Sequence, residues 1–169
     1  MGRADGAILC GDAVSLYPIR PVCENDHAWI LDSWSKSNAQ SRMAADAGAL
    51  YMGEQKRLIL RILYSPQTVA LMAHTPNDPD ALLGYAVGRR SPEHTVYYVY
   101  VRATLRRQRL ACALLSNMLD IPEEELRCKR VQFSHKPMVP SMKAPPPWVF
   151  NPYRNLDADV PEKMLRNAS

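Results

Sequence analysis

Cysteine is scarce in this chain, which excludes the scaffolds that cysteine builds. There are 4 cysteines among 169 residues, and no two of them form a C-x-x-C pair. This spacing supports neither a zinc site nor a disulfide framework, so we expect no bound metal and reduced thiols in a cytoplasmic chain. The four are Cys10, Cys23, Cys112 and Cys128.

Long hydrophobic runs are also absent, which argues against a membrane protein. The longest apolar stretches, such as residues 81–87, fall far short of the roughly 20 residues that span a bilayer. No charged and then apolar leader precedes a small-residue cleavage site. We therefore expect a chain that neither crosses a membrane nor is visibly secreted.

The composition is instead that of a globular domain. Hydrophobic residues make up 47% of the chain and charged residues 22%, which excludes global disorder. A chain of 169 residues has room for one domain with a tail. Folding of a chain of this length buries roughly 70% of the unfolded surface, so no disulfide or metal is needed to stabilise it.

The positive charge is confined to one short stretch. Lysine and arginine number 21 against 17 acidic residues, a net charge of +4. Residues 102–109 hold four arginines and no acid, so the rest of the chain balances at 17 against 17. Such local basicity indicates a site for an anion more than a general affinity for nucleic acid. The arginines are Arg102, Arg106, Arg107 and Arg109.

The hydrophobic periodicity predicts an α/β (α+β) fold class, with a mixed, mostly antiparallel sheet flanked by helices. Apolar residues at helical spacing predict one helix from an N-cap at Asn25 or Asp26 to about Ser37, and another over about 53–64. Runs rich in β-branched and aromatic residues predict the strands. The other expected elements are a strand at 17–22, a hairpin of 68–74 and 81–88, a strand at 95–101, a loop and helix at 105–119 and a last strand at 130–134.

The composition changes near the end of the chain. Seven of the 14 prolines lie within residues 137–161, and proline excludes a regular helix or a central strand there. Two interpretations stay open: an extended tail that lies over its own domain through Trp148, Phe150 and Tyr153, or an arm that docks on a protein partner. The expected organisation is an irregular arm at 1–16, a domain at 17–136 and a proline-rich arm at 137–169.

The most informative stretch joins the strand at 95–101 to the helix after it. A strand that feeds a helix through a basic loop directs several backbone N–H groups at one point, and such a point binds phosphate. The stretch resembles the acyl-CoA pyrophosphate loop of the GCN5-related N-acetyltransferase (GNAT) family. That pattern is Arg or Gln, two variable residues, Gly, one variable residue, then Gly or Ala. Its positions fall in order on Arg106, Arg107, Gln108, Arg109, Leu110 and Ala111.

The GNAT resemblance implies acetyl-CoA as a cosubstrate and a place for it. The sheet would splay after its fourth strand, with the pantetheine arm pairing to backbone near Tyr100 and Val101 and the diphosphate on the amides of residues 107–111. The chain departs from the family pattern at Arg109, which stands where the first glycine is usual. An arginine there either crowds the approach of phosphate or swings out and adds a cation.

The resemblance also implies catalytic groups. GNAT enzymes usually hold a carboxylate, or a water held by one, near the fourth strand to deprotonate the amine, and often a tyrosine to reprotonate the thiolate. The strand at 95–101 has no carboxylate, so the candidate bases are Glu93 and His94 at its start and His135 after the last strand. Tyr98 and Tyr100 are candidates for the acid. For each of them an ordinary role in a turn or in packing stays open.

A narrower resemblance, to small GNAT-like proteins of tailed bacteriophages, rests on residues 29–37, 98–101, 134–135 and 151–153. It implies a protein of the host cytoplasm or of a virion. Two functions follow: an N-acetyltransferase that moves acetyl from acetyl-CoA to an amine, or an inactive structural or interaction protein of a phage particle. The second would dock through residues 137–169, in a homo-oligomer or in virion assembly. Nucleic-acid binding by the arginines is not favoured, and it would require a steep salt dependence.

Overall fold

A computed structural model describes residues 17–40, 42–134 and 147–151. Six strands form one sheet in the order β1-β2-β3-β4-β5-β6, with antiparallel pairs from β1 to β4 and parallel pairs from β4 to β6. This confirms the expected mixed, mostly antiparallel sheet. The elements are β1 (Ile19–Pro21), α1 (Glu24–Ala39), α2 (Arg42–Tyr64), β2 (Val69–Thr75), β3 (Asp78–Arg89), β4 (Thr95–Val101), the 3-10 helix η1 (Ala103–Leu105), α3 (Leu110–Leu119), β5 (Val131–Phe133) and β6 (Trp148–Phe150).

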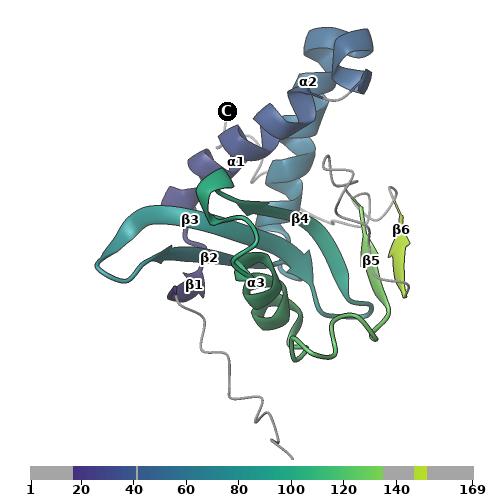
Figure 1. Ribbon diagram of the computed structural model, residues 1–169. Helices are drawn as coiled ribbons and strands as arrows, with labels where there is room; N and C mark the ends of the chain where they lie inside the picture. Colours follow the sequence, from purple (N-terminus) through teal and green to yellow (C-terminus); the bar gives the residue numbers. More distant parts are fainter. Residues whose placement is uncertain (1–16, 41, 135–146, 152–169) are drawn as a thin grey trace, which may run out of the picture.

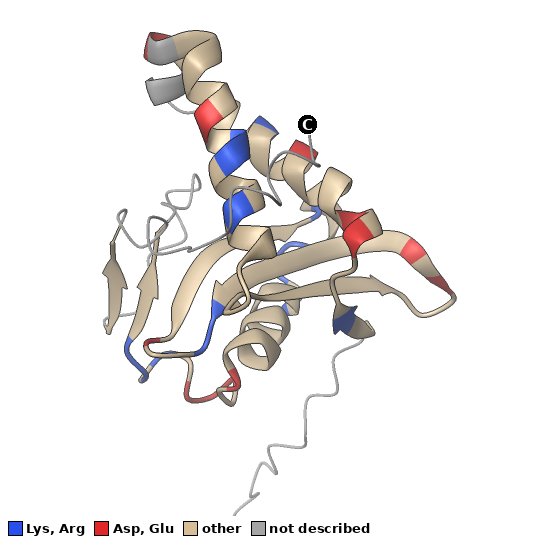
Figure 2. Cartoon of the chain, turned by 180° about the vertical axis from the view of Figure 1, so that it is seen from behind, with Lys and Arg blue, Asp and Glu red and all other residues tan. Residues whose placement is uncertain are grey.

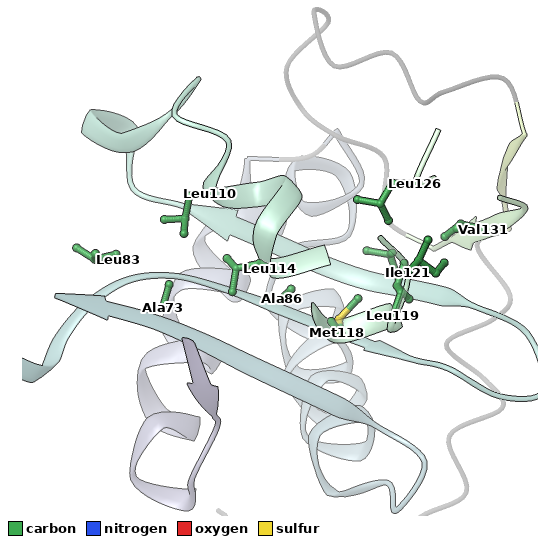
Figure 3. Close-up of a cluster of buried hydrophobic side chains, with 11 residues drawn as sticks. Ala73, Leu83, Ala86, Leu110, Leu114, Met118, Leu119, Ile121, Leu126 and Val131 are labelled. Carbon is green, nitrogen blue, oxygen red and sulfur yellow. The ribbon is translucent and has the colours of Figure 1, made fainter. Parts of the chain in front are cut away.

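Helices cover both faces of the sheet (Figure 1). α1 and α2 pack on one face through a cluster that includes Ile30 and Trp34, and α3 packs on the other through Leu114 and Met118. Figure 3 shows the second cluster, in which side chains of α3 lie close to the sheet residue Ala86. Each large apolar side chain that is fully buried stabilises the fold by about 1.5–3 kcal/mol. The two clusters therefore hold β3 and β4 firmly between them.

One extra residue in β4 breaks the regular alternation of its side chains. The pairing with β3 runs without a break over residues 98–101 and then skips from Tyr98 to Val96. Tyr97 is left over as a β-bulge, and Tyr97 and Tyr98 both join the cluster beneath α1 and α2. A bulge bends its strand and increases the local twist, so it redirects the second half of β4.

β4 and β5 separate soon after they meet. They run parallel and pair only at Thr95 with Gln132 and at Val96 with Phe133, after which the two strands diverge (Figure 1). Within the described residues, the last four residues of β4, 98–101, therefore have a partner strand, β3, on one side only. This is the splay after the fourth strand that the GNAT resemblance implies, and it leaves an open strand edge beside β5.

The start of α1 differs from the expectation. An N-cap at Asn25 or Asp26 is wrong, because the helix begins at Glu24 and Cys23 is its N-cap. Asp26 is instead the third helical residue, and its carboxylate reaches back to accept the Cys23 N–H at 2.9 Å. Arg20 of β1 holds the same carboxylate, with Nη1 2.6 Å from Oδ2. An acid that caps from the third position resembles an N-cap in the sequence, which explains the shift of register.

Two elements extend beyond the expected ones. α2 begins at Arg42, well before residue 53, and bends at Gly48, where φ is 62°. β6 adds an edge strand beyond β5, inside the stretch expected to be a proline-rich arm. Apart from residues 147–151 that arm lies outside the described residues, as does the expected arm at 1–16. In the described part of the chain, no helix is long and apolar enough to cross a membrane.

Candidate anion-binding site

The open edge of β4 presents backbone groups that could pair with a ligand. In the ladder with β3, Arg102 donates its N–H to the Leu83 carbonyl at 3.0 Å. Hydrogen-bonding directions alternate along an antiparallel strand, so Tyr100 also points its backbone groups at β3, whereas Val99 and Val101 point theirs at the open edge. An extended ligand beside β4 would therefore pair with Val99 and Val101, and the backbone of Tyr100 is already used.

The basic loop after β4 is held against the end of the strand. The Arg106 Nε lies 3.5 Å from the Val101 carbonyl. Gln108 is held at both ends of its amide: Oε1 accepts from the Tyr17 hydroxyl at 3.3 Å, and Nε2 donates to the Thr104 carbonyl at 3.4 Å. These contacts fix the position of the loop relative to the open edge of β4.

The amino end of α3 has backbone N–H groups that make no hydrogen bond within the helix. The first turn of an α-helix has no partners for its own N–H groups, which here belong to Leu110, Ala111 and Cys112, and no side chain caps them. Within the described residues, the backbone N–H groups of Arg107 and Gln108 also have no backbone hydrogen-bond partner. The helix dipole adds about 0.3–1 kcal/mol for an anion at this end. The arrangement is suited to phosphate.

Two arginines of the loop adopt left-handed backbone conformations. Arg107 has φ of 67°, and Arg109, the N-cap of α3, has φ of 61°. Arg109 occupies the glycine position of the GNAT pattern, and its backbone keeps the conformation that glycine favours. For a residue with a side chain that conformation costs roughly 1–2 kcal/mol. The motif therefore departs from the family pattern in the side chain and not in the backbone.

The Arg109 side chain reaches toward the acidic turn that follows α3. Its Nη2 lies 2.7 Å from Oε2 of Glu123. Figure 2 shows this turn in red at the lower edge of the molecule. The side chain therefore swings out, but its charge is paired with Glu123, so it does not add the cation that this alternative expected.

The remaining arginines of the stretch are in no ion pair among the described residues. All four are exposed, and among the described residues Arg109 is the only one of them in an ion pair. Each charge-assisted hydrogen bond to a phosphate is worth about 1.5–3 kcal/mol. In the described ranges, no group of three or more His, Cys, Asp and Glu side chains could hold a metal ion. The groups that the loop offers a ligand are therefore backbone amides and guanidinium groups.

The two candidate tyrosines lie on the other face of the sheet, beneath α1. Tyr98 is buried and stacks on Trp34 with ring centroids 4.7 Å apart, and burial raises the pKa of its phenol. Tyr100 is half-buried, stacked on Tyr85 at 5.7 Å and edge-on to Trp29 at 5.6 Å. The raised pKa of Tyr98 keeps its phenol protonated at neutral pH, which a proton donor requires. The role of either tyrosine as the acid stays a prediction.

Two of the three candidate bases, Glu93 and His94, are not brought to the arginine loop. Glu93 precedes β4, at the end where β4 and β5 pair, and its carboxylate accepts a hydrogen bond from the Gln132 amide. His94 follows it, and the Gln132 N–H donates to the His94 carbonyl at 2.9 Å. The splay opens at the opposite end of β4. His135 lies outside the described residues, so its role and that of Glu93 stay predictions.

Three residues contribute to the site although no sequence motif identifies them. Glu123 belongs to a run of three glutamates, and only complementary charge relates that run to Arg109, 14 residues earlier. Tyr17 precedes the first strand, 91 residues from the glutamine that it contacts. A Cβ at Gly84 would lie 2.6 Å from the Tyr100 carbonyl, so glycine permits the close approach of β3 and β4.

Comparison with known proteins gives structural likenesses only, because no family model and no curated protein matches the chain. The ribosomal-protein-alanine N-acetyltransferase of Brucella melitensis biovar Abortus 2308 is 21% identical with a TM-score of 0.44, over 75% of this chain and 84% of that one. An acetyltransferase of Vibrio fischeri is 17% identical with a TM-score of 0.43, over 69% and 93%. The aminoglycoside antibiotic 6'-N-acetyltransferase of Acinetobacter baumannii is 15% identical with a TM-score of 0.43, over 75% and 83%. These values describe what the chain is similar to and assign it no activity.

Proposed function

We propose that the chain binds acetyl-CoA at the splay between β4 and β5 and transfers the acetyl group to an amine. The observation that carries the proposal is one continuous segment, residues 99–112, in which an open strand edge leads through a basic loop into an uncapped helix. An acyl-CoA has an extended pantetheine arm followed by a diphosphate. The segment offers backbone for pairing and then N–H groups for phosphate in the same order.

The binding residues have distinct tasks in this proposal. The pantetheine arm pairs with the backbone of Val99 and Val101, as an added strand would. The diphosphate accepts hydrogen bonds from the first turn of α3 and charge-assisted ones from Arg106 and Arg107. The thioester then lies beside the open half of β4, in the splay between β4 and β5.

Acetyl transfer needs two proton movements. The amine nitrogen attacks the thioester carbonyl, a C–N bond forms, and the C–S bond breaks to release a thiolate that takes up a proton. Tyr100 is the proposed donor, because it is half-buried and lies on the open half of β4. The amine must also lose a proton, and the open half of β4 has no carboxylate for this step. His135, which follows β5 in the sequence, is the proposed base.

Titration calorimetry with acetyl-CoA tests the binding site. We expect the double variant R106A/R107A to bind at least about 100-fold more weakly than the unchanged chain, because two charge-assisted contacts of about 1.5–3 kcal/mol each are lost. Its melting temperature should stay the same, since both side chains are exposed.

A matched control removes the same charge from the opposite face of the sheet. Arg57 and Arg61 are exposed on α2, where Figure 2 shows basic and acidic positions interspersed. R57A/R61A should bind acetyl-CoA as the unchanged chain does. An equal loss in both double variants would mean general charge attraction and no specific site. Absence of binding by the unchanged chain would reject the proposal.

A thiol-release assay over a panel of amines tests the transfer. We expect Y100F to lower kcat at least tenfold while the dissociation constant for acetyl-CoA stays within about twofold, because the phenol acts on the leaving thiolate and not on binding. A Y100F variant with unchanged kcat would remove Tyr100 from the mechanism.

A second candidate is a GNAT-like structural or interaction protein without catalysis, which the phage resemblance would place in a virion. Two observations favour it: Arg109 stands at the glycine position, and the open half of β4 has no carboxylate. It predicts that the chain binds a partner through the proline-rich arm and releases no thiol. Because β6 belongs to the sheet, the test is a deletion of residues 152–169, which should abolish assembly and leave the domain folded.

A further inference from the structure

We infer that Glu123 is a positioning residue of the phosphate site, which holds the Arg109 guanidinium away from the amino end of α3 and so sets the affinity for the diphosphate. The inference rests on the proposed function, because it concerns the same site. It is carried by the ion pair between Arg109 Nη2 and Glu123 Oε2 at 2.7 Å. Arg109 is also the N-cap of α3, so its side chain starts where an anion would bind.

Glu123 is the fixed partner of this pair. Its side chain is 18% exposed, whereas that of Arg109 is 70% exposed. The turn that carries Glu123 is closed by hydrogen bonds from the N–H groups of Glu125 and Leu126 to the Pro122 carbonyl, at 2.9 and 3.1 Å. Leu126 is buried in the cluster beneath α3. The turn is therefore anchored, and Arg109 is the side chain that adjusts.

The neighbouring glutamates do not share this contact. Glu124 is exposed, and it is in no ion pair among the described residues. Glu125 pairs with Lys129 at 3.2 Å. The pairing with the arginine loop is thus specific to Glu123, and Glu124 provides a variant with the same change of charge in the same turn.

The ion pair between Arg109 and Glu123 changes how strongly the loop attracts an anion. A guanidinium engaged by a carboxylate has its charge balanced, and it adds little to the attraction of a phosphate. An ion pair with one exposed partner is weak, so a change at Glu123 releases Arg109 readily. The released side chain lies beside the uncapped N–H groups of α3, where a diphosphate would bind. Glu123 therefore lowers affinity by withholding one cation.

Titration calorimetry of the full chain with coenzyme A tests the inference through a double-mutant cycle. We expect E123Q to bind about three- to tenfold more tightly than the unchanged chain, and E124Q to bind within about twofold of it. R109G should also stay within about twofold, because Arg109 is already withheld and glycine suits the left-handed backbone. R109G/E123Q should bind as R109G does, since the released cation is gone.

Each other result overturns the inference or the proposed function in a recognisable way. Equal or weaker binding by E123Q, while the unchanged chain binds, overturns the role of Glu123 and leaves the proposed function standing. An equal gain in E124Q would show an effect of net charge only. If thermal melting shows that E123Q is unfolded, the affinity of R109G for coenzyme A decides between the outcomes. A tenfold loss of affinity in R109G would mean that the Arg109 side chain already contacts the phosphate, and it would overturn the inference. Binding by none of the proteins would overturn both proposals.

Discussion

The amino ends of α1 and α3 differ in how their free N–H groups are satisfied. In α1 the third helical residue is Asp26, which accepts the Cys23 N–H and pairs with Arg20. In α3 the third helical residue is Cys112, which is exposed, and the N-cap is Arg109. The first turn of α1 contains two acids, and that of α3 contains none.

The difference separates a structural helix end from a functional one. The hydrogen bond from Arg20 lowers the pKa of Asp26 to about 2, so at neutral pH the amino end of α1 always has an anion supplied by the chain. The amino end of α3 has N–H groups and no acid in its first turn. Under the proposed function, the diphosphate of acetyl-CoA supplies the anion at this end.

Removing the acid of α1 should have the largest effect on stability. We expect D26A to lower the free energy of unfolding by about 2–4 kcal/mol, because the variant loses a helix cap and leaves Arg20 without its partner. Chemical unfolding in urea measures this change. Acetyl-CoA binding should be unaffected in the folded fraction, since α1 lies on the other face of the sheet from α3.

The matched control for D26A is D32A on the same helix. Asp32 pairs with Lys36 at 2.7 Å, but both side chains are more than half exposed, so we expect a loss below about 0.5 kcal/mol. Equal losses in the two variants would show that the cap at the start of α1 has no special importance.

The pH dependence of stability should reveal the same carboxylate. The folded-state pKa of Asp26 is about 2, below its ordinary value of 3.8, so its contribution is complete above pH 4 and lost as the pH falls toward 2. We expect it to amount to roughly 2 kcal/mol. Urea unfolding between pH 2 and pH 6 measures it, and D26N should lack this part of the dependence. A D26N curve parallel to that of the unchanged chain would assign the effect to other acids.

Much of the fold could be predicted from the sequence because its local patterns are strong. β4 occupies the bounds that were expected, since seven consecutive β-branched and aromatic residues leave no competing period. The basic loop and α3 follow it as expected.

The rest depends on register and on distant contacts, which a local pattern does not contain. The bulge at Tyr97 shifts the pairing by one residue, so Val99 and not Tyr100 points its backbone at the open edge. The contact of Arg109 with Glu123 depends on how the turn after α3 folds back. β6 joins the sheet only through pairing with β5. None of these features alters the spacing of hydrophobic residues in its own segment, so a local pattern does not reveal it.

The sharpest test of this comparison places an acid in the first turn of α3, at the position that Asp26 has in α1. Cys112 in α3 occupies the position of Asp26 in α1, three residues after the N-cap, and it is exposed. We expect C112D to raise the free energy of unfolding by about 0.3–1 kcal/mol, because an acid favours this end of a helix, and to weaken acetyl-CoA binding about tenfold, because that acid occupies the place of the phosphate. C112N has the same shape without the charge and should bind within about twofold of the unchanged chain. If C112D alone unfolds with a higher free energy and binds acetyl-CoA more weakly, the uncapped end of α3 is kept for a ligand at the expense of stability. If C112D binds acetyl-CoA as the unchanged chain does, the anion binds elsewhere.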